Sequence, residues 1–85
     1  MNFKAEIDVM PLKELLDPQG KAVTNSMSNI GVSNISNVRI GKHISLEVQA
    51  DNKVEAEEKV KTACEKLLSN PVMEYFNFEI SSLSH

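Results

Sequence analysis

The sequence predicts a small α+β domain, and three observations lead to this prediction. Apolar residues alternate with polar ones near both ends of the chain, which is the period of a half-buried β-strand. Two stretches between them repeat apolar residues at the spacing of an amphipathic helix. The chain has 85 residues, of which 41% are hydrophobic and 25% charged, a balance typical of one globular domain. We therefore expect a single domain over residues 1–85, with residues 81–85 as a frayed tail.

The first strand and the first helix are marked by alternation and by capping residues. A strand is expected over Phe3–Val9, where every second residue is apolar, and Pro11 would end it. A helix is expected to begin at Asp17, a favourable N-cap, with Pro18 at its first position. Gly31 can adopt a positive φ, so we expect the helix to end there.

Residues 35–50 predict a β-hairpin, and one alternative stays open. The apolar residues of this stretch are all even-numbered: Val38, Ile40, Ile44, Leu46 and Val48. A three-residue loop at 41–43 would oppose residue 40 to 44 and residue 38 to 46, which keeps the apolar side chains on one face. A two-residue loop would instead bring polar side chains into the core. The alternative is one long strand bent at Gly41.

The second helix is predicted to begin at Asn52, because Glu55 three residues later completes a capping box, and to end before Pro71. Its apolar stripe consists of Ala56, Val60, Ala63, Cys64, Leu67 and Leu68. Alternation over residues 76–80 predicts the last strand. The resulting βαββαβ order favours a ferredoxin-like two-layer sandwich, with a largely antiparallel sheet and two helices on one face.

The residues contain no recognisable catalytic or metal-binding set. Cys64 lies in an apolar stripe, where a thiol is buried and unreactive, and neither His43 nor His85 has ligand partners at metal-site spacing. A net charge of −3 argues against nucleic acid as a partner, and no apolar run is long enough to cross a membrane. The single cysteine and the absence of a signal-peptide pattern favour the cytoplasm. A small core without disulfide or metal favours self-association.

Two polar regions are candidate contact surfaces for a partner, namely the start of the first helix and the tip of the predicted hairpin. Their residues are Asp17, Gln19, Lys21, Arg39, Lys42 and His43. Helix capping is a sufficient explanation for the first region, and a solvated basic tip is one for the second. Contact with a partner and these simpler explanations both remain open.

Three stretches together resemble the PurS family of phosphoribosylformylglycinamidine synthase subunits: LDPQGKAV at 16–23, NVRIGKHI at 37–44 and CEKLLSNPV at 64–72. The resemblance runs from about Phe3 to Ile80. It departs from the family pattern at His43, Ser45 and Tyr75.

The resemblance implies a non-catalytic subunit in de novo purine biosynthesis. Such a subunit is a homodimer or tetramer that bridges the synthetase (large) subunit and the glutaminase subunit and assists ammonia transfer. ATP and magnesium would be used by the synthetase subunit, so none is expected on this chain. The alternative is a small-molecule-sensing, oligomeric ferredoxin-like regulatory domain, although fold analogy alone gives it weak support.

Overall fold

The computed structural model describes residues 1–15 and 17–83. Strand β1 (Asn2–Pro11) leads into helix α1 (Pro18–Met27), which a short 3₁₀ turn extends to Ile30. Strand β2 (Lys42–Gln49) is followed by helix α2 (Lys53–Ala63) and by strand β3 (Glu74–Ser82). The predicted α+β class and antiparallel sheet are confirmed.

The sheet has three strands in the order β2-β1-β3, and β1 pairs antiparallel with both neighbours. Ile7 lies opposite Ile44 on β2 and opposite Phe78 on β3. Alternate residues therefore form one apolar face and one polar face, as the period of two requires. On β1 the apolar face is fully covered, since Ala5, Ile7 and Val9 are each 0% exposed.

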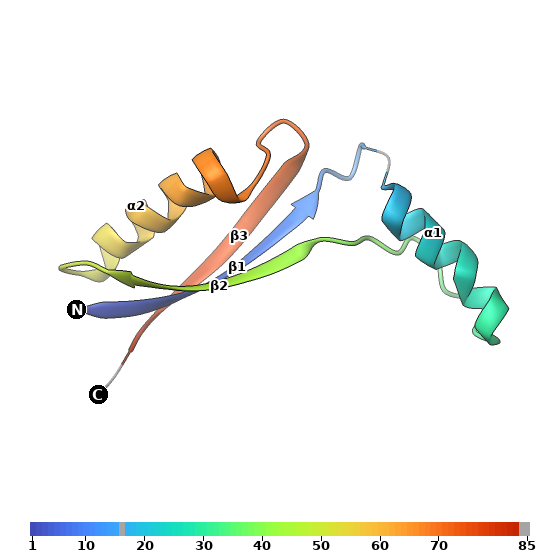
Figure 1. Ribbon diagram of the computed structural model, residues 1–85, viewed down its shortest axis with the longest axis horizontal. Coiled ribbons are helices and arrows are strands. Elements are labelled where there is room, and N and C mark those ends of the chain that lie inside the picture. Colours follow the sequence, from blue (N-terminus) through green and yellow to red (C-terminus); the bar gives the residue numbers. More distant parts are fainter. Residues whose placement is uncertain (16, 84–85) are drawn as a thin grey trace.

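Helix α2 covers this apolar face (Figure 1). Its residues Val60 and Cys64 pack with the buried residues of β1 in the core, which confirms the expected buried thiol. The helix begins at Asn52, whose side chain accepts the amide of Glu55 as predicted. Leu67 is 80% exposed, so the predicted stripe was wrong there. The last turn, Cys64–Leu68, is a π-helix, and its wider turn rotates the following residues away from the helix face.

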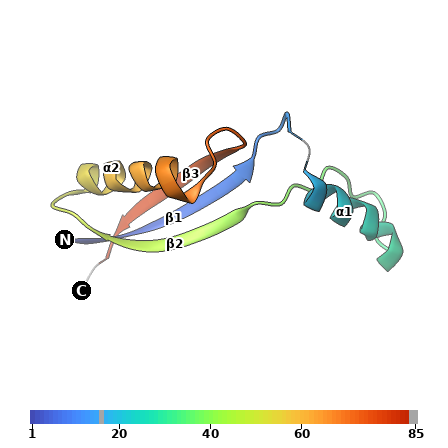
Figure 2. The same ribbon diagram turned by 45° about the horizontal axis from the view of Figure 1, so that its top comes forward.

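Helix α1 does not lie on the sheet, and here the prediction of two helices on one face was wrong. Figures 1 and 2 both show α1 beyond the end of the sheet, at the opposite end of the molecule from the N-terminus. The chain measures 51 × 31 × 14 Å and has a radius of gyration of 16.7 Å. A compact chain of this length has a radius of gyration of about 12 Å. One chain by itself is thus unusually extended.

The predicted hairpin was also wrong, because the stretch contains one strand that begins at Lys42. Residues 38–41 precede it without strand pairing in the described part of the chain, so the described element order is β-α-β-α-β. The amides of Val38 and Ile40 instead donate to side chains of α1 and its cap. The expected frayed tail was wrong for Ser81 and Ser82, which belong to β3, while residues 84–85 lie outside the described residues.

Candidate functional site

The side chain of Asp17 connects the start of α1 to the segment before β2. Its Oδ1 accepts the amide of Gly20 at 3.0 Å, and its Oδ2 accepts the amide of Ile40 at 2.9 Å. The hydrogen bond from the Ile40 amide contributes most to lowering the pKa of the Asp17 carboxyl below its ordinary value, and the hydrogen bond from the Gly20 amide contributes next. Asp17 is therefore both a helix cap and a tether between two segments distant in sequence.

The guanidinium of Arg39 fastens the same segment to the loop that follows β1. Its Nη2 donates to the carbonyls of Leu12 at 2.7 Å and Pro11 at 3.1 Å, and its Nη1 donates to that of Lys13 at 3.3 Å. Its Nε lies 3.7 Å from Oδ2 of Asp17. A planar donor group of this kind can bind several acceptors at once, which an ammonium on a flexible stem does less well.

Close packing completes this connection. The hydroxyl of Thr24 accepts the amide of Val38 at 3.1 Å and donates to the carbonyl of Gly20 at 2.9 Å. Gly20 is buried, and a Cβ at this position would overlap the carbonyl oxygen of Val38. We call these contacts of residues 17–24 and 11–13 with residues 38–40 the joint. We call residues 17–41, which the joint holds together, the arm.

The structure brings together two of the six predicted contact residues, Asp17 and Arg39, in the joint. The side chains of Gln19, Lys21 and Lys42 are exposed and make no hydrogen bond or ion pair with another described residue. His43 lies elsewhere, on the polar face of the sheet. Residues 17–24 and 38–40, which come from or directly follow two of the three stretches singled out in the sequence, thus meet in one connection that their separation in the sequence conceals.

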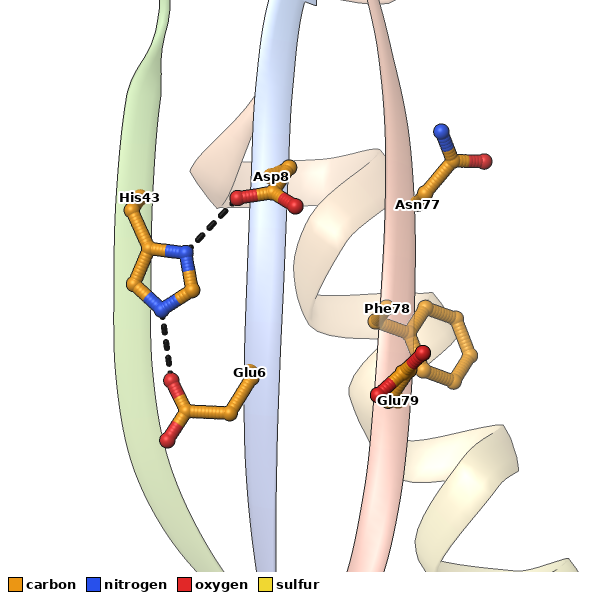
Figure 3. Close-up of a pocket in the computed structure, with 6 residues that line it drawn as sticks. All are labelled: Glu6, Asp8, His43, Asn77, Phe78 and Glu79. Carbon is orange, nitrogen blue, oxygen red and sulfur yellow. Dashed lines mark hydrogen bonds and ion pairs between the residues drawn. The ribbon is translucent and has the colours of Figure 1, made fainter.

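A second polar cluster surrounds His43 on the open face of the sheet (Figure 3). Its Nδ1 lies 2.7 Å from Oδ1 of Asp8, and its Nε2 lies 2.5 Å from Oε2 of Glu6. The hydroxyl of Ser45 donates to Oε1 of Glu6 at 2.9 Å, and Nζ of Lys4 lies 3.2 Å from the same oxygen. These are cross-strand neighbours, because Asp8 pairs with His43 and Glu6 with Ser45.

The hydrogen bonds of this cluster favour an ionised Glu6 carboxylate and a protonated His43 imidazole. Hydrogen bonds from His43, Ser45 and Lys4 lower the pKa of Glu6 to about 2. Hydrogen bonds with Asp8 and Glu6 raise the pKa of His43 above its ordinary value. Both ring nitrogens of His43 are already paired with carboxylates. The imidazole consequently has no free nitrogen with which to act as a general base or nucleophile.

Sequence reasoning missed Glu6 and Asp8 as partners of His43, and it missed Gly20 and Thr24 in the joint. The register between β1 and β2 would have identified the first two, but alternation alone leaves the register open. Within residues 1–15 and 17–83, no group of three or more His, Cys, Asp or Glu side chains could hold a metal ion. No described helix is long and apolar enough to span a bilayer.

The His43 cluster gives a testable pH dependence. We expect His43 to titrate above pH 6.5, and Asp8→Asn to move its pKa back toward 6.5, because Asp8 contributes most to the shift. Stability contributed by protonated His43 is complete below pH 6.5 and is lost as pH rises through its folded pKa. Stability contributed by ionised Glu6 is complete above about pH 4.5 and is lost as pH falls toward 2.

The measurement is an NMR titration of the imidazole protons in wild type and Asp8→Asn, with His43→Gln used to assign the signals. Urea denaturation across the same pH range reports the linked stability, which we expect to be greatest between about pH 4.5 and 6.5. A His43 pKa at or below 6.5 in the wild type would contradict the cluster geometry.

Comparison with known proteins places the chain among relatives of similar length. Residues 4–82 match the family model "PurS: Phosphoribosylformylglycinamidine (FGAM) synthase". The chain is 37% identical over 82 residues to the PurS subunit of that synthase from Synechocystis, covering 96% of this chain and 82% of the relative. It is 42% identical over 74 residues to the Thermotoga maritima PurS subunit, covering 87% and 90%.

The fold agrees with solved structures of the same kind. A chain in the structure of PurLQS from Thermotoga maritima superimposes with a TM-score of 0.87 at 38% identity, covering 95% of this chain and 99% of that one. Bacillus subtilis PurS superimposes with a TM-score of 0.83 at 33% identity, covering 94% and 99%. The joint and the three-stranded sheet thus belong to a chain that is a member of the PurS family, a subunit of the glutamine-using, ATP-dependent ligase phosphoribosylformylglycinamidine synthase in purine biosynthesis.

Proposed function

We propose that this chain is the non-catalytic assembly subunit of its synthase. It would bridge the ATP-dependent synthetase subunit and the glutaminase subunit in the cytoplasm, as a homodimer or tetramer, and assist the passage of ammonia between them. The observation that carries this proposal is the likeness to the chain in PurLQS over nearly the whole length.

The chemistry of the reaction explains why such a subunit is needed. A glutaminase releases ammonia at one site, and the ligase consumes it at another, where ATP with magnesium activates an amide oxygen of the substrate. Ammonia that escapes into water is protonated and is no longer a nucleophile. A protein that holds the two sites in register therefore raises the yield of each glutamine without supplying a catalytic residue.

The test is reconstitution with and without this chain. The three purified subunits are mixed, and ATP hydrolysis and product formation are measured with either glutamine or an ammonium salt as nitrogen donor. We expect omission of this chain to abolish glutamine-dependent turnover while ammonium-dependent turnover by the synthetase persists. Unchanged glutamine-dependent turnover in its absence would overturn the proposal.

The partner-contact residues need a sharper experiment, because Asp17 and Arg39 also hold the joint together. Gln19, Lys21 and Lys42 are exposed and have no such structural role. We expect the triple variant Gln19→Ala, Lys21→Ala, Lys42→Ala to weaken assembly by about tenfold or more, since loss of 1.4 kcal/mol at an interface has that effect. Its circular dichroism spectrum should remain that of the wild type.

A matched triple variant of exposed residues on α2, which also removes two positive charges and one neutral polar side chain, controls for loss of charge at the surface: Lys53→Ala, Lys61→Ala and Thr62→Ala. Sedimentation of each variant with the two partner subunits measures assembly. Equal affinity of both triple variants and the wild type for the partners would show that the first set makes no contact.

A further inference from the structure

A groove lies between two loops at one end of the sheet: residues 11–15, which follow β1, and residues 70–74, which lead into β3. Figures 1 and 2 both show these loops beside each other at this end. The groove has a volume of about 280 Å³ and lies apart from the His43 cluster. Among the described residues, its lining consists of Pro11, Leu15, Asn70, Met73 and Glu74.

The first wall of the groove is held by backbone hydrogen bonds. The guanidinium of Arg39 binds the three consecutive carbonyls of residues 11–13. The amide of Leu15 donates to the carbonyl of Leu12 at 3.1 Å. The amide of Leu12 donates in turn to the carbonyl of Met73 at 2.9 Å, which joins the first wall to the second.

Asn70 organises the second wall. Its side-chain Oδ1 accepts the amide of Val72 at 3.1 Å, and its own amide donates to Oε1 of Glu74 at 2.7 Å. Its carbonyl accepts the amides of Met73 at 3.0 Å and Glu74 at 2.7 Å. Both walls are therefore fixed within one chain, and a groove that is already ordered loses little conformational entropy when it binds an occupant.

The lining combines apolar side chains with one carboxylate. Pro11, Leu15 and Met73 supply the apolar surface, and Met73 is still 52% exposed. Glu74 makes no ion pair with another described residue, so its negative charge is unmatched beside this apolar surface. An occupant that carries a positive charge next to an apolar side chain complements both features.

We propose that this groove binds one large apolar side chain of a partner subunit of the synthase, and that a lysine or arginine of the same segment pairs with Glu74. The volume suits a single side chain, because sites for whole small molecules begin at about 300 Å³. Apolar anchors that fill a pocket carry much of the affinity of protein interfaces. This inference rests on the assembly role in the proposed function and specifies one surface that performs it.

The groove also gives a role to the third stretch singled out in the sequence, residues 64–72, which contributes neither to the joint nor to the His43 cluster. Its buried Ser69 ends the last turn after α2, since the Ser69 amide and hydroxyl donate to the carbonyl of Cys64 at 3.0 and 2.8 Å. Asn70 follows directly and begins the second wall. The stretch thus connects that wall to the buried core at Cys64.

Two substitutions test the groove while its walls stay in place. Met73→Gln keeps the length of the side chain but makes it polar. Glu74→Gln keeps an oxygen that can accept the Asn70 amide but removes the charge. The matched controls are Leu67→Gln and Glu57→Gln, at exposed positions outside the groove. Titration calorimetry with the purified synthetase subunit and, separately, with the purified glutaminase subunit measures the affinities.

We expect Met73→Gln to weaken binding of one of these subunits by about tenfold or more, which corresponds to 1.4 kcal/mol. Glu74→Gln should weaken binding of the same subunit, and its difference from the wild type should shrink as salt is added, because salt screens an exposed ion pair. Leu67→Gln and Glu57→Gln should bind both subunits as the wild type does.

Oxidation of methionine by peroxide provides a second measurement on the wild-type chain. Met73 lines the groove, whereas Met1 is 73% exposed and precedes the other end of β1. Oxidation of a methionine sulfur depends on its exposure. We expect the subunit that binds in the groove to slow the oxidation of Met73 and to leave that of Met1 unchanged. Equal oxidation of Met73 in the free and bound chain would contradict the proposal.

The outcomes separate this inference from the proposed function. If glutamine-dependent turnover requires this chain but Met73→Gln and Glu74→Gln bind both subunits as tightly as the wild type, the groove is not the contact and assembly uses another surface. If the two variants alter self-association and not the binding of either subunit, the occupant is a second copy and the proposal is wrong. A chain that binds neither subunit overturns the proposed function and this inference together.

Discussion

Gly20→Ala is expected to undock α1 from the segment before β2, with a loss of about 2 kcal/mol from the stability of the joint. In an ordinary helix the same substitution would stabilise by up to about 1 kcal/mol, because alanine is the better helix former. Here the new methyl group would overlap the backbone carbonyl of Val38, and backbone cannot rotate away as a side chain can. The sign of the effect is therefore the opposite of the one that helix propensity predicts.

Amide hydrogen exchange measures this effect where it occurs. The amides of Val38 and Ile40 donate to Thr24 and Asp17, so they exchange only when the joint opens. A loss of 2 kcal/mol corresponds to exchange about 30-fold faster at these two amides. Exchange in β1, which α2 covers, should change far less because the joint does not contribute to that core.

Gln19→Ala is the matched control, since Gln19 is the exposed neighbour of Gly20 in the same helical turn. We expect it to leave the exchange of both amides at or below the wild-type rate. Wild-type exchange at Val38 and Ile40 in Gly20→Ala would mean that α1 accommodates the methyl group and that the joint is looser than its contacts indicate.

Local patterns predicted the individual elements well because the physics behind them is local. The cap at Asn52 needs only the amide of Glu55 three residues away, and the strand at β1 needs only alternation. The burial of Cys64 follows from the apolar stripe of a single helix. In each case the interaction that determines the structure lies within a few residues of the residue that reveals it.

The errors arose where a distant contact outweighs a local pattern. Residues 38–40 have the alternation of a strand. The amide of Val38 nevertheless donates to Thr24, and the amide of Ile40 donates to Asp17, both of which lie far away in the sequence. Leu67 has helical spacing, but the π-turn rotates it into solvent. Val38 and Ile40 are accordingly half-buried within one chain without belonging to a strand.

The sequence identified residues of the joint, but it did not predict which of them contact one another. Asp17 and Arg39 were both identified, each at the end of a different predicted element. Their meeting depends on the course of the loop after β1, and no pattern in the sequence encodes that course. His43 was assigned to the same surface as Arg39, although the alternation of strand β2 places it on the polar face with Asp8.

Ile7→Ala is expected to cost about 3–4 kcal/mol of the free energy of unfolding, the range for a large aliphatic side chain removed from a core. Ile7 is 0% exposed and lies in the central strand, between Ile44 and Phe78 and beneath α2. One helix on three strands leaves few neighbours that can shift to fill the cavity. An 85-residue domain has a total stability of roughly 4–13 kcal/mol, so this one change would remove a large share of it.

Urea denaturation of Ile7→Ala measures this cost. Val54→Ala is the control, because it also shortens an aliphatic side chain to alanine but at an exposed position. Val54 is 65% exposed on α2, so its replacement should change stability by no more than about 0.5 kcal/mol. Both variants need a series of chain concentrations, because an oligomer gains stability by mass action. The cost of Ile7→Ala should be the same at every concentration, since its side chain is already covered within one chain. A cost that grows with concentration would instead place Ile7 in the contact between copies, and a cost below 1 kcal/mol would mean that the sheet and α2 pack too loosely to form the core described above.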